Sequence, residues 1–289
     1  MPSSMPAFTD RFSVLAPNYD LLLCDVWGVV HNGVAAYPEA CDALKRFRAG
    51  GGSVILITNA PRPGEAVVPL LDRYGVAREA YDGIVSSGDV TREAIGGRPG
   101  ESVFHLGPER DRSIFDGLGL RFAPVESADY AVCSGLADDE TETPEDYRAL
   151  LGVMRQRNLF MICGNPDVVV ERGDKRIYCA GAIADLYGTL GGKVLYAGKP
   201  YRPIYDRALA KAAQARGAAV AHRRVLAIGD SLRTDFTGAR ELGIDFLFVT
   251  SGIHAEELGA RDNPDAAALR EIFSAAGQSP KGITRRLAW

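Results

Sequence analysis

The chain has 289 residues, 46% of them hydrophobic and 24% charged, a composition typical of globular proteins that bury a sizeable core without disulfide or metal cross-links. Its length favours about two domains. The formal net charge is −4 and no long run of one sign occurs, which argues against nucleic acid as the main partner, because a phosphate backbone requires a basic surface.

The N-terminal segment lacks the basic start and the apolar stretch of a signal peptide. No apolar run approaches the ~20 residues that span a bilayer, so we expect a cytoplasmic protein with no membrane partner. The five cysteines are odd in number and form no C-x-x-C pair. They are therefore predicted to be buried free thiols in a reducing compartment.

The first predicted elements alternate between strands and helices. Residues 21–24 are a short apolar run that ends at Asp25. A helix is predicted from Pro38 to the glycines at 50–52, because Pro suits a first turn and Gly a stop. Residues 53–58 are predicted to form a buried strand, and a helix follows. This order predicts a parallel sheet with right-handed crossovers.

The last third of the chain repeats this alternation. We assign its strands to the same sheet as the first ones, so the predicted fold class is α/β, with a doubly wound parallel-sheet core. The predicted strands are residues 194–197, 224–228 and 245–249, and the predicted helices are residues 203–216 and 234–242.

A third segment separates these two halves and carries strands and helices of its own. A segment that interrupts one sheet and has its own core-forming pattern is typical of an inserted domain. We therefore predict a core of residues 1–96 and 193–289 and an inserted αβ domain of residues 97–192. The tail after Pro264 is predicted to add one helix and a loose end.

Four polar residues follow the predicted strands: Asp25, Thr58, Lys199 and Asp230. Ligands of parallel sheets bind beyond the carboxyl ends of the strands. Each residue alone can be explained as a helix cap, but the four together indicate a chemistry. Two carboxylates suit Mg²⁺, a lysine and a threonine hydroxyl suit an anionic phosphoryl group, and an aspartate can be a nucleophile that forms an acyl-phosphate.

These four residues belong to short motifs with a defined order and spacing. Thr58 follows Asp25 by 33 residues, and Asp230 follows Lys199 by 31 residues. The motifs are residues 25–29 (DVWGV), 57–60 (ITNA), 198–200 (GKP) and 229–235 (GDSLRTD).

Motif for motif, the chain resembles the haloacid dehalogenase (HAD) superfamily, and its insert between the second and third motifs corresponds to a class II cap. Residues 165–167 (NPD) and 181–206 resemble the class IIA subfamily of NagD-type sugar phosphatases and p-nitrophenyl or pyridoxal phosphatases. The resemblance covers roughly residues 20–255. It implies a HAD-like hydrolase that acts on a phosphomonoester, sugar-phosphate-like or another small phosphorylated metabolite.

The resemblance also implies a metal site, with Mg²⁺ as the cofactor. Asp25 would be both the nucleophile and a metal ligand, and Trp27 would offer its backbone carbonyl to the metal. Asp230 would be the second carboxylate ligand, while Asp235 would support a metal-bound water.

A substrate site is implied as well. Thr58 and Asn59 would bind the phosphoryl group, and Lys199 would pair with the nucleophile and the phosphate. The cap would cover the site and select the substrate, with Asn165 and Asp167 near its entrance. Caps of this subfamily often form dimer contacts, so the resemblance is compatible with a homodimer.

Trp27 departs from the family pattern, which places here a second aspartate that protonates the leaving oxygen and later activates water. Indole has no titrating group, and loss of a general acid typically costs about 10²–10⁴-fold in rate. Three interpretations follow: a phosphatase with another acid or with leaving groups that need little protonation, a weak or inactive phosphate-ligand-binding protein, or a dehalogenase. Asp230 and Asp235 disfavour the last, because carbon–halogen cleavage needs no metal.

Two histidines are candidate substitute acids. His31 lies six residues after Asp25 in a loop, and its ordinary pKa suits proton transfer near neutrality; the alternative is an exposed loop residue. His254 follows the last predicted core strand, from which it would reach the rim of the site.

Overall fold

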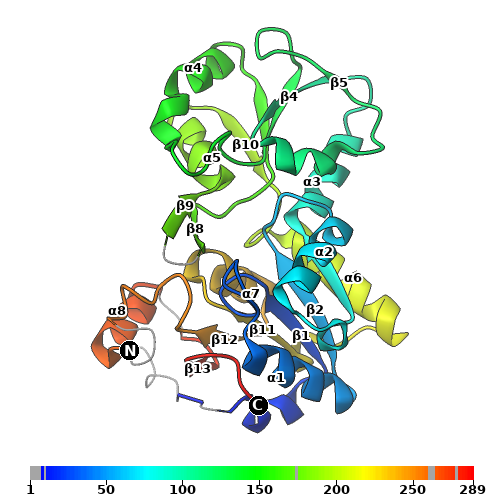
Figure 1. Ribbon diagram of the computed structural model, residues 1–289, viewed down its shortest axis with the longest axis vertical. Helices are drawn as coiled ribbons and strands as arrows, with labels where there is room; N and C mark the ends of the chain where they lie inside the picture. The colour runs from blue at the N-terminus through cyan, green and yellow to red at the C-terminus, as the bar shows by residue number, and fades with distance from the viewer. Residues whose placement is uncertain (1–7, 10, 173–174, 260–263, 277–278) are drawn as a thin grey trace. The chain divides into compact units, whose positions relative to one another are not determined.

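The structure is a computed structural model that describes residues 8–289 apart from residues 10, 173–174, 260–263 and 277–278. The chain divides into two compact units, each with a sheet of its own (Figure 1). The predicted insert, residues 97–192, lies within the second unit. The first unit contains Met1–Ile57, Pro69–Ile84 and Tyr205–Trp289, and the second contains Thr58–Val68 and Val85–Ile204.

The sheet of the first unit has six strands in the order β13-β12-β11-β1-β2-β3. β1 pairs in parallel with β11 and β2, and β12 pairs in parallel with β11 and β13. β1, β2 and β11 are buried at every residue, as expected for strands covered on both faces. The strands are β1 Leu21–Asp25, β2 Ser53–Thr58, β3 Gly83–Ser86, β11 Val225–Gly229, β12 Asp245–Val249 and β13 Gly282–Thr284.

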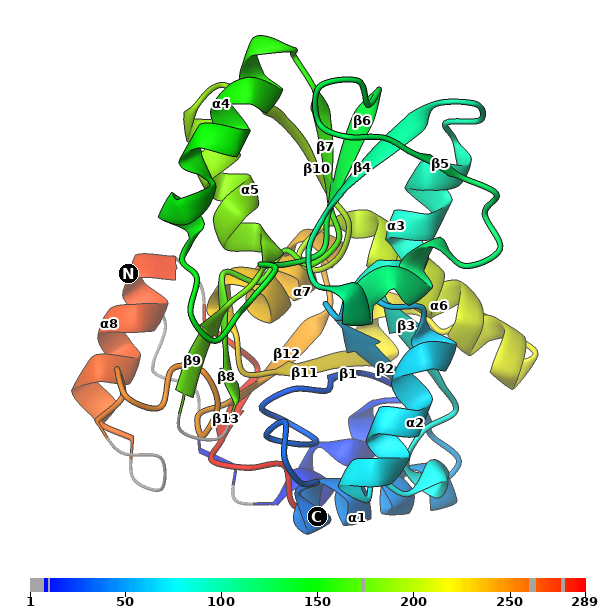
Figure 2. The same ribbon diagram turned by 45° about the horizontal axis from the view of Figure 1, so that its top comes forward.

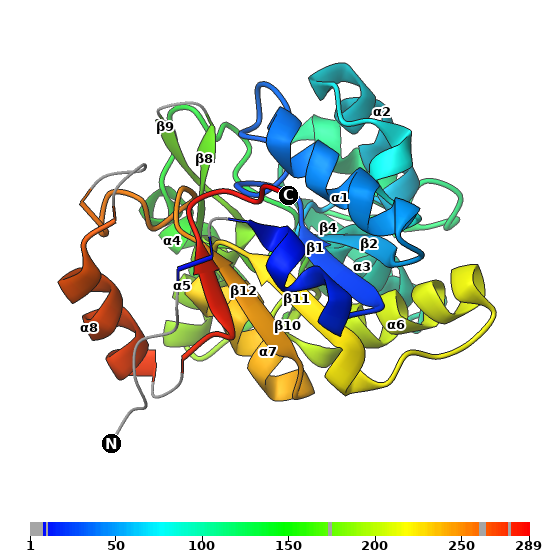
Figure 3. The same ribbon diagram turned by 90° about the horizontal axis from the view of Figure 1, so that it is seen from below.

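Helices lie on both faces of this sheet, with α1 on one face and α6 and α7 on the other (Figure 3). α1 begins at Pro38, whose fixed φ suits the first turn, and buries Leu44 and Phe47. α7 ends at Gly243, which adopts the left-handed conformation that favours glycine. The helices of this part of the chain are α1 Pro38–Ala49, α2 Gly64–Tyr74, α6 Arg202–Arg216, α7 Thr237–Leu242 and α8 Ala266–Ala276.

The second unit is built on a five-stranded sheet in the order β10-β7-β6-β4-β5, in which all neighbouring strands are parallel. α4 and α5 lie on one side of this sheet and α3 on the other (Figure 2). A separate antiparallel hairpin is formed by β8 and β9. The elements are α3 Ser87–Gly96, β4 Ser102–Leu106, β5 Arg121–Phe122, β6 Tyr130–Cys133, α4 Arg148–Gln156, β7 Phe160–Cys163, β8 Val169–Arg172, β9 Lys175–Tyr178, α5 Ala180–Thr189 and β10 Lys193–Tyr196.

Two predictions are contradicted by the structure. The strand predicted at residues 194–197 exists as β10, but it pairs with β7 at the edge of the second sheet, so its assignment to the first sheet is wrong. The chain end is not loose: β13 joins the first sheet, and the Trp289 ring packs at 6.0 Å from the Phe12 ring. The helix predicted in the tail is α8.

The cysteine prediction is confirmed in its structural part, because all five cysteines are buried and free. Burial raises the pKa of the Cys133 thiol to about 12, which keeps it protonated. Among the described residues, no helix is both long enough and apolar enough to cross a bilayer.

Candidate active site

The carboxyl ends of three neighbouring strands of the first sheet carry three of the predicted site residues, Asp25, Thr58 and Asp230. Asp25 is the last residue of β1, and Asp230 follows the last residue of β11 directly. The pairing of Cys24 with Ile228 sets these two strand ends at the same level. On the other side of β1, Asp25 pairs with Ile57, one residue before Thr58 at the end of β2. A parallel sheet binds its ligands at this edge.

Three carboxylates come together at this edge in the first unit. One oxygen atom each from Asp25, Asp230 and Asp235 lies within 4.8 Å of the others, and all three residues are buried. Buried carboxylates at such distances repel one another, and a divalent cation between them offsets that repulsion. An all-oxygen donor set suits a hard cation such as Mg²⁺. The cluster therefore fits a metal ion, as the sequence analysis predicted.

The Asp230 carboxylate is held closely by backbone. The amide of Ile253 donates to Oδ2 of Asp230 at 2.8 Å. A Cβ atom added at Gly252 would lie 1.8 Å from the same oxygen, and one added at Gly28 would lie 2.1 Å from it. Gly28 also has a φ of +86°, which disfavours any side chain. Only glycine at both positions leaves room for this carboxylate.

Sequence analysis named only His254 from the loop after β12 and missed the backbone contact of this loop to Asp230. Besides the amide of Ile253, the loop contributes His254, whose Nε2 accepts from the Leu232 amide at 3.3 Å. The other ring nitrogen of His254 lies 2.8 Å from Oε2 of Glu257. Both ring nitrogens therefore have protein partners, and His254 braces the loop that carries Asp230 rather than offering an acid at a rim. Gly252, which leaves room for the Asp230 carboxylate, was the signal in the sequence that could have indicated this backbone contact.

Trp27 is packed within the loop that follows β1. A Cβ atom added at Gly33 would lie 2.5 Å from the indole ring, so the glycine leaves the space that the ring fills. The His31 ring stands edge-on to the indole at a centroid distance of 5.2 Å, and the centroid of the Tyr74 ring lies 4.8 Å from that of His31. The backbones of Trp27 and His31 also form a β-bridge.

His31 is neither an exposed residue nor a suitable acid. Its side chain is only 3% exposed, and its Nδ1 accepts a hydrogen bond of 2.9 Å from the Gly33 amide. Burial lowers the pKa of His31 to about 4, so the ring is neutral at pH 7. Both interpretations that the sequence offered for His31 are therefore wrong.

The second unit brings together the predicted residues of the second and third motifs. The side-chain amide of Asn59 donates to the Asp167 carboxylate at 3.0 Å and to the Lys199 carbonyl at 3.2 Å, and its oxygen accepts from the Lys199 amide at 2.7 Å. Asn59 and Lys199 are buried. The Asn59 side chain thus connects two turns, and only its backbone amide can still contact a phosphoryl group.

The turn at residues 165–167 has an internal cause. Oδ1 of Asn165 accepts from the Asp167 amide at 3.0 Å, which is the turn that asparagine side chains favour. This turn directs the Asp167 carboxylate to Asn59. Gly198 also packs against the Asn59 side chain, because a Cβ atom at this glycine would lie 2.5 Å from Oδ1 of Asn59. Thr58 accepts a hydrogen bond from the amide of Ala60 at its hydroxyl.

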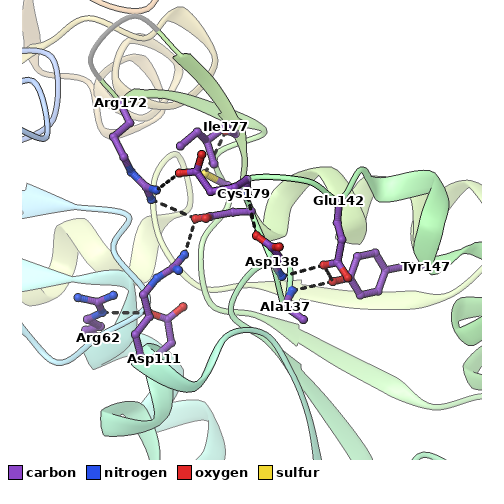
Figure 4. A network of polar contacts seen from close by, with 12 residues as sticks. Arg62, Asp111, Ala137, Asp138, Glu142, Tyr147, Arg172, Ile177 and Cys179 are labelled. Carbon is purple, nitrogen blue, oxygen red and sulfur yellow. Dashed lines mark hydrogen bonds and ion pairs between the residues drawn. The ribbon is translucent and has the colours of Figure 1, made fainter.

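A polar network extends from the second motif through the second unit (Figure 4). The Arg62 guanidinium donates through Nε to Oδ1 of Asp111 at 2.9 Å. Asp111 is buried, and desolvation raises the pKa of its carboxyl, although Arg62 opposes that rise. On hairpin β8–β9, Arg172 donates to Asp139 at 3.0 Å. Sequence analysis missed this network, because its members lie far apart in the chain.

The similarity to known proteins is extensive. A family model described as haloacid dehalogenase-like hydrolase matches residues 22–121, and one described as HAD-hydrolase-like matches residues 196–272. A hydrolase of the haloacid dehalogenase-like family from Brucella suis 1330 is 46% identical in sequence, with a TM-score of 0.87 and coverage of 97% of this chain and 100% of that one.

More distant relatives carry specific names. The 4-nitrophenylphosphatase of Schizosaccharomyces pombe is 23% identical, over 91% of this chain and 92% of its own. The glycerol phosphate phosphatase of Mycobacterium tuberculosis, solved in complex with magnesium, is 24% identical with a TM-score of 0.63, covering 85% of this chain and 73% of that one. The chain carries an aspartate at the end of β1 and a carboxylate cluster at the same sheet edge, and a solved relative is 46% identical over 97% of this chain. The chain therefore belongs to the haloacid dehalogenase-like hydrolases.

Proposed function

We propose that this chain is a Mg²⁺-dependent phosphomonoester hydrolase that forms an aspartyl-phosphate on Asp25. The observation that carries the proposal is the buried cluster of Asp25, Asp230 and Asp235, with oxygen atoms within 4.8 Å of one another. An aspartate beside a cation site, at the edge where parallel sheets bind ligands, suits covalent phosphoryl chemistry. The phosphatase names of the relatives in Schizosaccharomyces pombe and Mycobacterium tuberculosis support it.

The metal is proposed from the donor set. Asp25 and Asp230 would supply carboxylate oxygens, Trp27 its backbone carbonyl, and Asp235 a further acceptor at the edge of the site. Mg²⁺ prefers one or two carboxylates together with substrate phosphate oxygens, and it supplies the positive charge that a phosphoryl group under attack requires. The magnesium complex of the Mycobacterium tuberculosis relative supports this choice of ion.

Asp25 would divide hydrolysis into two steps. In the first, a carboxylate oxygen attacks phosphorus while the bond to the leaving oxygen breaks and its electron pair leaves with that oxygen. In the second, water attacks the same phosphorus and the Asp25 carboxylate is released with free phosphate. β1 holds Asp25 between two paired strands, which fixes its backbone for this attack.

The substrate is proposed to be a small phosphorylated metabolite. The Thr58 hydroxyl, the backbone amide of Asn59 and the Lys199 ammonium group would bind its phosphoryl oxygens. Residues 97–192 would act as a cap domain that selects the rest of the molecule, with Asn165 and Asp167 near its entrance. The Asn59 contacts to Asp167 and Lys199 support a shared role for these segments.

A second candidate function is favoured by Trp27. A protein on this scaffold without a general acid can bind a phosphorylated ligand and turn it over slowly or not at all. Such a binding protein would be stabilised by the ligand without releasing phosphate. Dehalogenase chemistry is disfavoured, because the three-carboxylate cluster suits a cation that carbon–halogen cleavage does not need.

The test is hydrolysis of p-nitrophenyl phosphate with and without Mg²⁺, using Asp25→Asn as the control. We expect nitrophenolate release that depends on Mg²⁺ and is lost in Asp25→Asn, while circular dichroism and thermal melting show both proteins folded. Turnover by Asp25→Asn would contradict the nucleophile. Thermal stabilisation of the wild type by phosphate esters, without turnover of any, would favour the binding protein.

A further inference from the structure

The loop after β1 has consequences for the substrate class, and they rest on the function proposed above. The position two residues after the nucleophile is where the phosphatases that this chain resembles carry the acid that protonates the leaving group. Here it holds Trp27, which donates only its indole N–H and does not titrate. The question is whether the rest of this loop replaces the missing acid.

The loop is built around the indole ring instead of around an acid. Gly33, with a φ of +82°, provides a surface without a side chain, and an added Cβ atom would lie 2.5 Å from the ring. His31 is turned edge-on to the indole and packs on Tyr74. Its Nδ1 accepts from the Gly33 amide, and His31 is 3% exposed. The imidazole of His31 is therefore part of the packing.

The second histidine of the first unit near this edge is also engaged. His254 accepts from the Leu232 amide and pairs with Glu257, so it holds the loop that carries Asp230. A ring committed at both nitrogens supports its neighbours and does not deliver a proton to a leaving group. Neither of the two histidines that the sequence suggested thus replaces an aspartate at position 27.

The first chemical step then depends on the leaving group. When an oxygen of Asp25 attacks phosphorus, the electron pair of the breaking P–O bond goes to the leaving oxygen. A carboxylate, whose conjugate acid has a pKa of about 4, or an acidic phenolate can carry this pair without a proton. An alkoxide, whose conjugate acid is about as weak as water at about 15.7, cannot. Sugar and glycerol phosphates release alkoxides.

The second step is affected as well. Water that attacks the phosphorus of the aspartyl-phosphate must lose a proton while the Asp25 carboxylate departs. The residue that would accept this proton is the same one that would have donated it in the first step. Without it, breakdown of the covalent species becomes slower than its formation whenever the leaving group is good.

We propose that this enzyme acts on phosphoryl donors whose leaving group is a weak base, namely acyl phosphates and acidic aryl phosphates, and that breakdown of its aspartyl-phosphate limits turnover. Trp27 is the residue that sets this selectivity. Its indole packs on Gly33 and His31 and takes the place of the proton donor that alkyl esters need.

Leaving-group selectivity provides the first measurement. The value of kcat/KM is measured with Mg²⁺ for acetyl phosphate, p-nitrophenyl phosphate, phenyl phosphate and glycerol 1-phosphate. The proteins are the wild type, Trp27→Asp and Trp27→Asn. The two variant side chains have the same size and leave the same space, but only that of Trp27→Asp can transfer a proton. We expect the ratio of nitrophenyl to glycerol phosphate to fall by about 10²–10⁴-fold in Trp27→Asp and to stay high in Trp27→Asn.

The rate-limiting step provides a second, independent measurement. Stopped-flow mixing of wild type with p-nitrophenyl phosphate should release about one equivalent of nitrophenolate per active site before the slower steady state begins, the sign of an accumulating covalent intermediate. Acid-quenched protein should then carry one phosphoryl group on the peptide that contains Asp25. The burst should shrink in Trp27→Asp and persist in Trp27→Asn.

The outcomes separate this inference from the function on which it rests. If wild type hydrolyses none of the four substrates, the phosphatase proposal fails. If it hydrolyses them all with similar kcat/KM and shows no burst, the enzyme is a phosphatase and the inference about Trp27 is wrong. If both variants lose selectivity alike, an altered loop and not the acid is responsible, which also overturns the inference. Thermal melting of both variants establishes that they fold.

Discussion

Replacing Asn59 by aspartate tests the contacts that join the second and third motifs. The exchange preserves the shape of the side chain but turns an amide that donates two hydrogen bonds into a carboxylate that donates none. It would face the Asp167 carboxylate at 3.0 Å and the Lys199 carbonyl at 3.2 Å, where the amide nitrogen now lies. Asn59 is 2% exposed, so solvent screens this repulsion poorly.

The magnitude follows from these contacts. A hydrogen bond to a charged group contributes about 1.5–3 kcal/mol and one to a neutral carbonyl about 1 kcal/mol. Repulsion between two close carboxylates in a medium of intermediate dielectric adds a similar amount before protonation relieves it. We expect Asn59→Asp to lower the free energy of unfolding by about 5–8 kcal/mol at pH 8.

The loss should depend on pH. The repulsion raises the pKa of the new carboxyl in the folded protein, so the variant is penalised above that pKa and recovers as the pH falls through it, because a protonated carboxyl can again donate to Asp167. The control is Asn59→Leu, which loses these two hydrogen bonds and also the one that Oδ1 accepts from the Lys199 amide, without gaining a charge. It should show a penalty of about 3–5 kcal/mol that does not follow pH.

Urea unfolding followed by far-ultraviolet circular dichroism is the suitable assay. Circular dichroism reports on both units, whereas both tryptophans, Trp27 and Trp289, belong to the first unit and Asn59 belongs to the second. If the aspartate and leucine variants unfolded at the same urea concentration at pH 8 and at pH 5, the contacts that we assign to the Asn59 amide would be refuted.

Two further predictions concern the first unit. The pKa of His31 is about 4 in the folded protein and about 6.5 in the unfolded chain. The contribution of neutral His31 to the free energy of unfolding is therefore complete above pH 6.5, and up to about 3 kcal/mol of it is lost as the pH falls from 6.5 through 4. His31→Phe should flatten that part of the stability profile, measured by tryptophan fluorescence, and an unchanged profile would argue against its burial. Mg²⁺ should raise the melting temperature of the wild type but not of Asp230→Asn. The surface variant Asp42→Asn is the control and should respond as the wild type does. A full rise of the melting temperature in Asp230→Asn would contradict the metal site.

The sequence predicted the central strands of the first sheet because of how these strands are buried. β1, β2 and β11 are apolar on both faces and end at turn-forming or polar residues, so their bounds and their common edge could be inferred without long-range information. Asp25, Thr58 and Asp230 followed from those strand ends. The carboxylate of Asp235, five residues after Asp230, joins the same cluster as the fourth motif predicted.

β10 shows where this reasoning stops. Its sequence resembles the other strands, but alternate residues are exposed and it lies at the edge of the second sheet. Which sheet a strand joins depends on partners far away in the chain, and no local pattern specifies them. Lys199 was therefore selected by an argument about the wrong sheet, although its backbone does meet Asn59.

The role of Asn59 could not be predicted for the same reason. An asparagine in this motif can turn its amide toward a ligand or toward the protein, and the choice was settled here by partners 108 and 140 residues away. Asp111 is a similar case, since nothing near it in the sequence indicates that Arg62 is its partner. Buried polar pairs that span long stretches of sequence leave no periodic pattern.

Trp27 differs from these cases because the residues that accommodate it are close in sequence and can be read together. Gly33 adopts a positive φ and leaves the space of a side chain to the indole. The His31 ring stands edge-on to the indole, and its Nδ1 accepts a hydrogen bond from the Gly33 amide. A tryptophan that had merely replaced an aspartate in an unchanged loop would have no reason to find a glycine and a histidine ring packed against it. These two matched partners imply that the loop is organised for an aromatic residue. Restoring an aspartate at position 27 should therefore restore proton transfer while leaving a gap beside Gly33, so that Trp27→Asp gains activity on alkyl esters and loses stability at the same time.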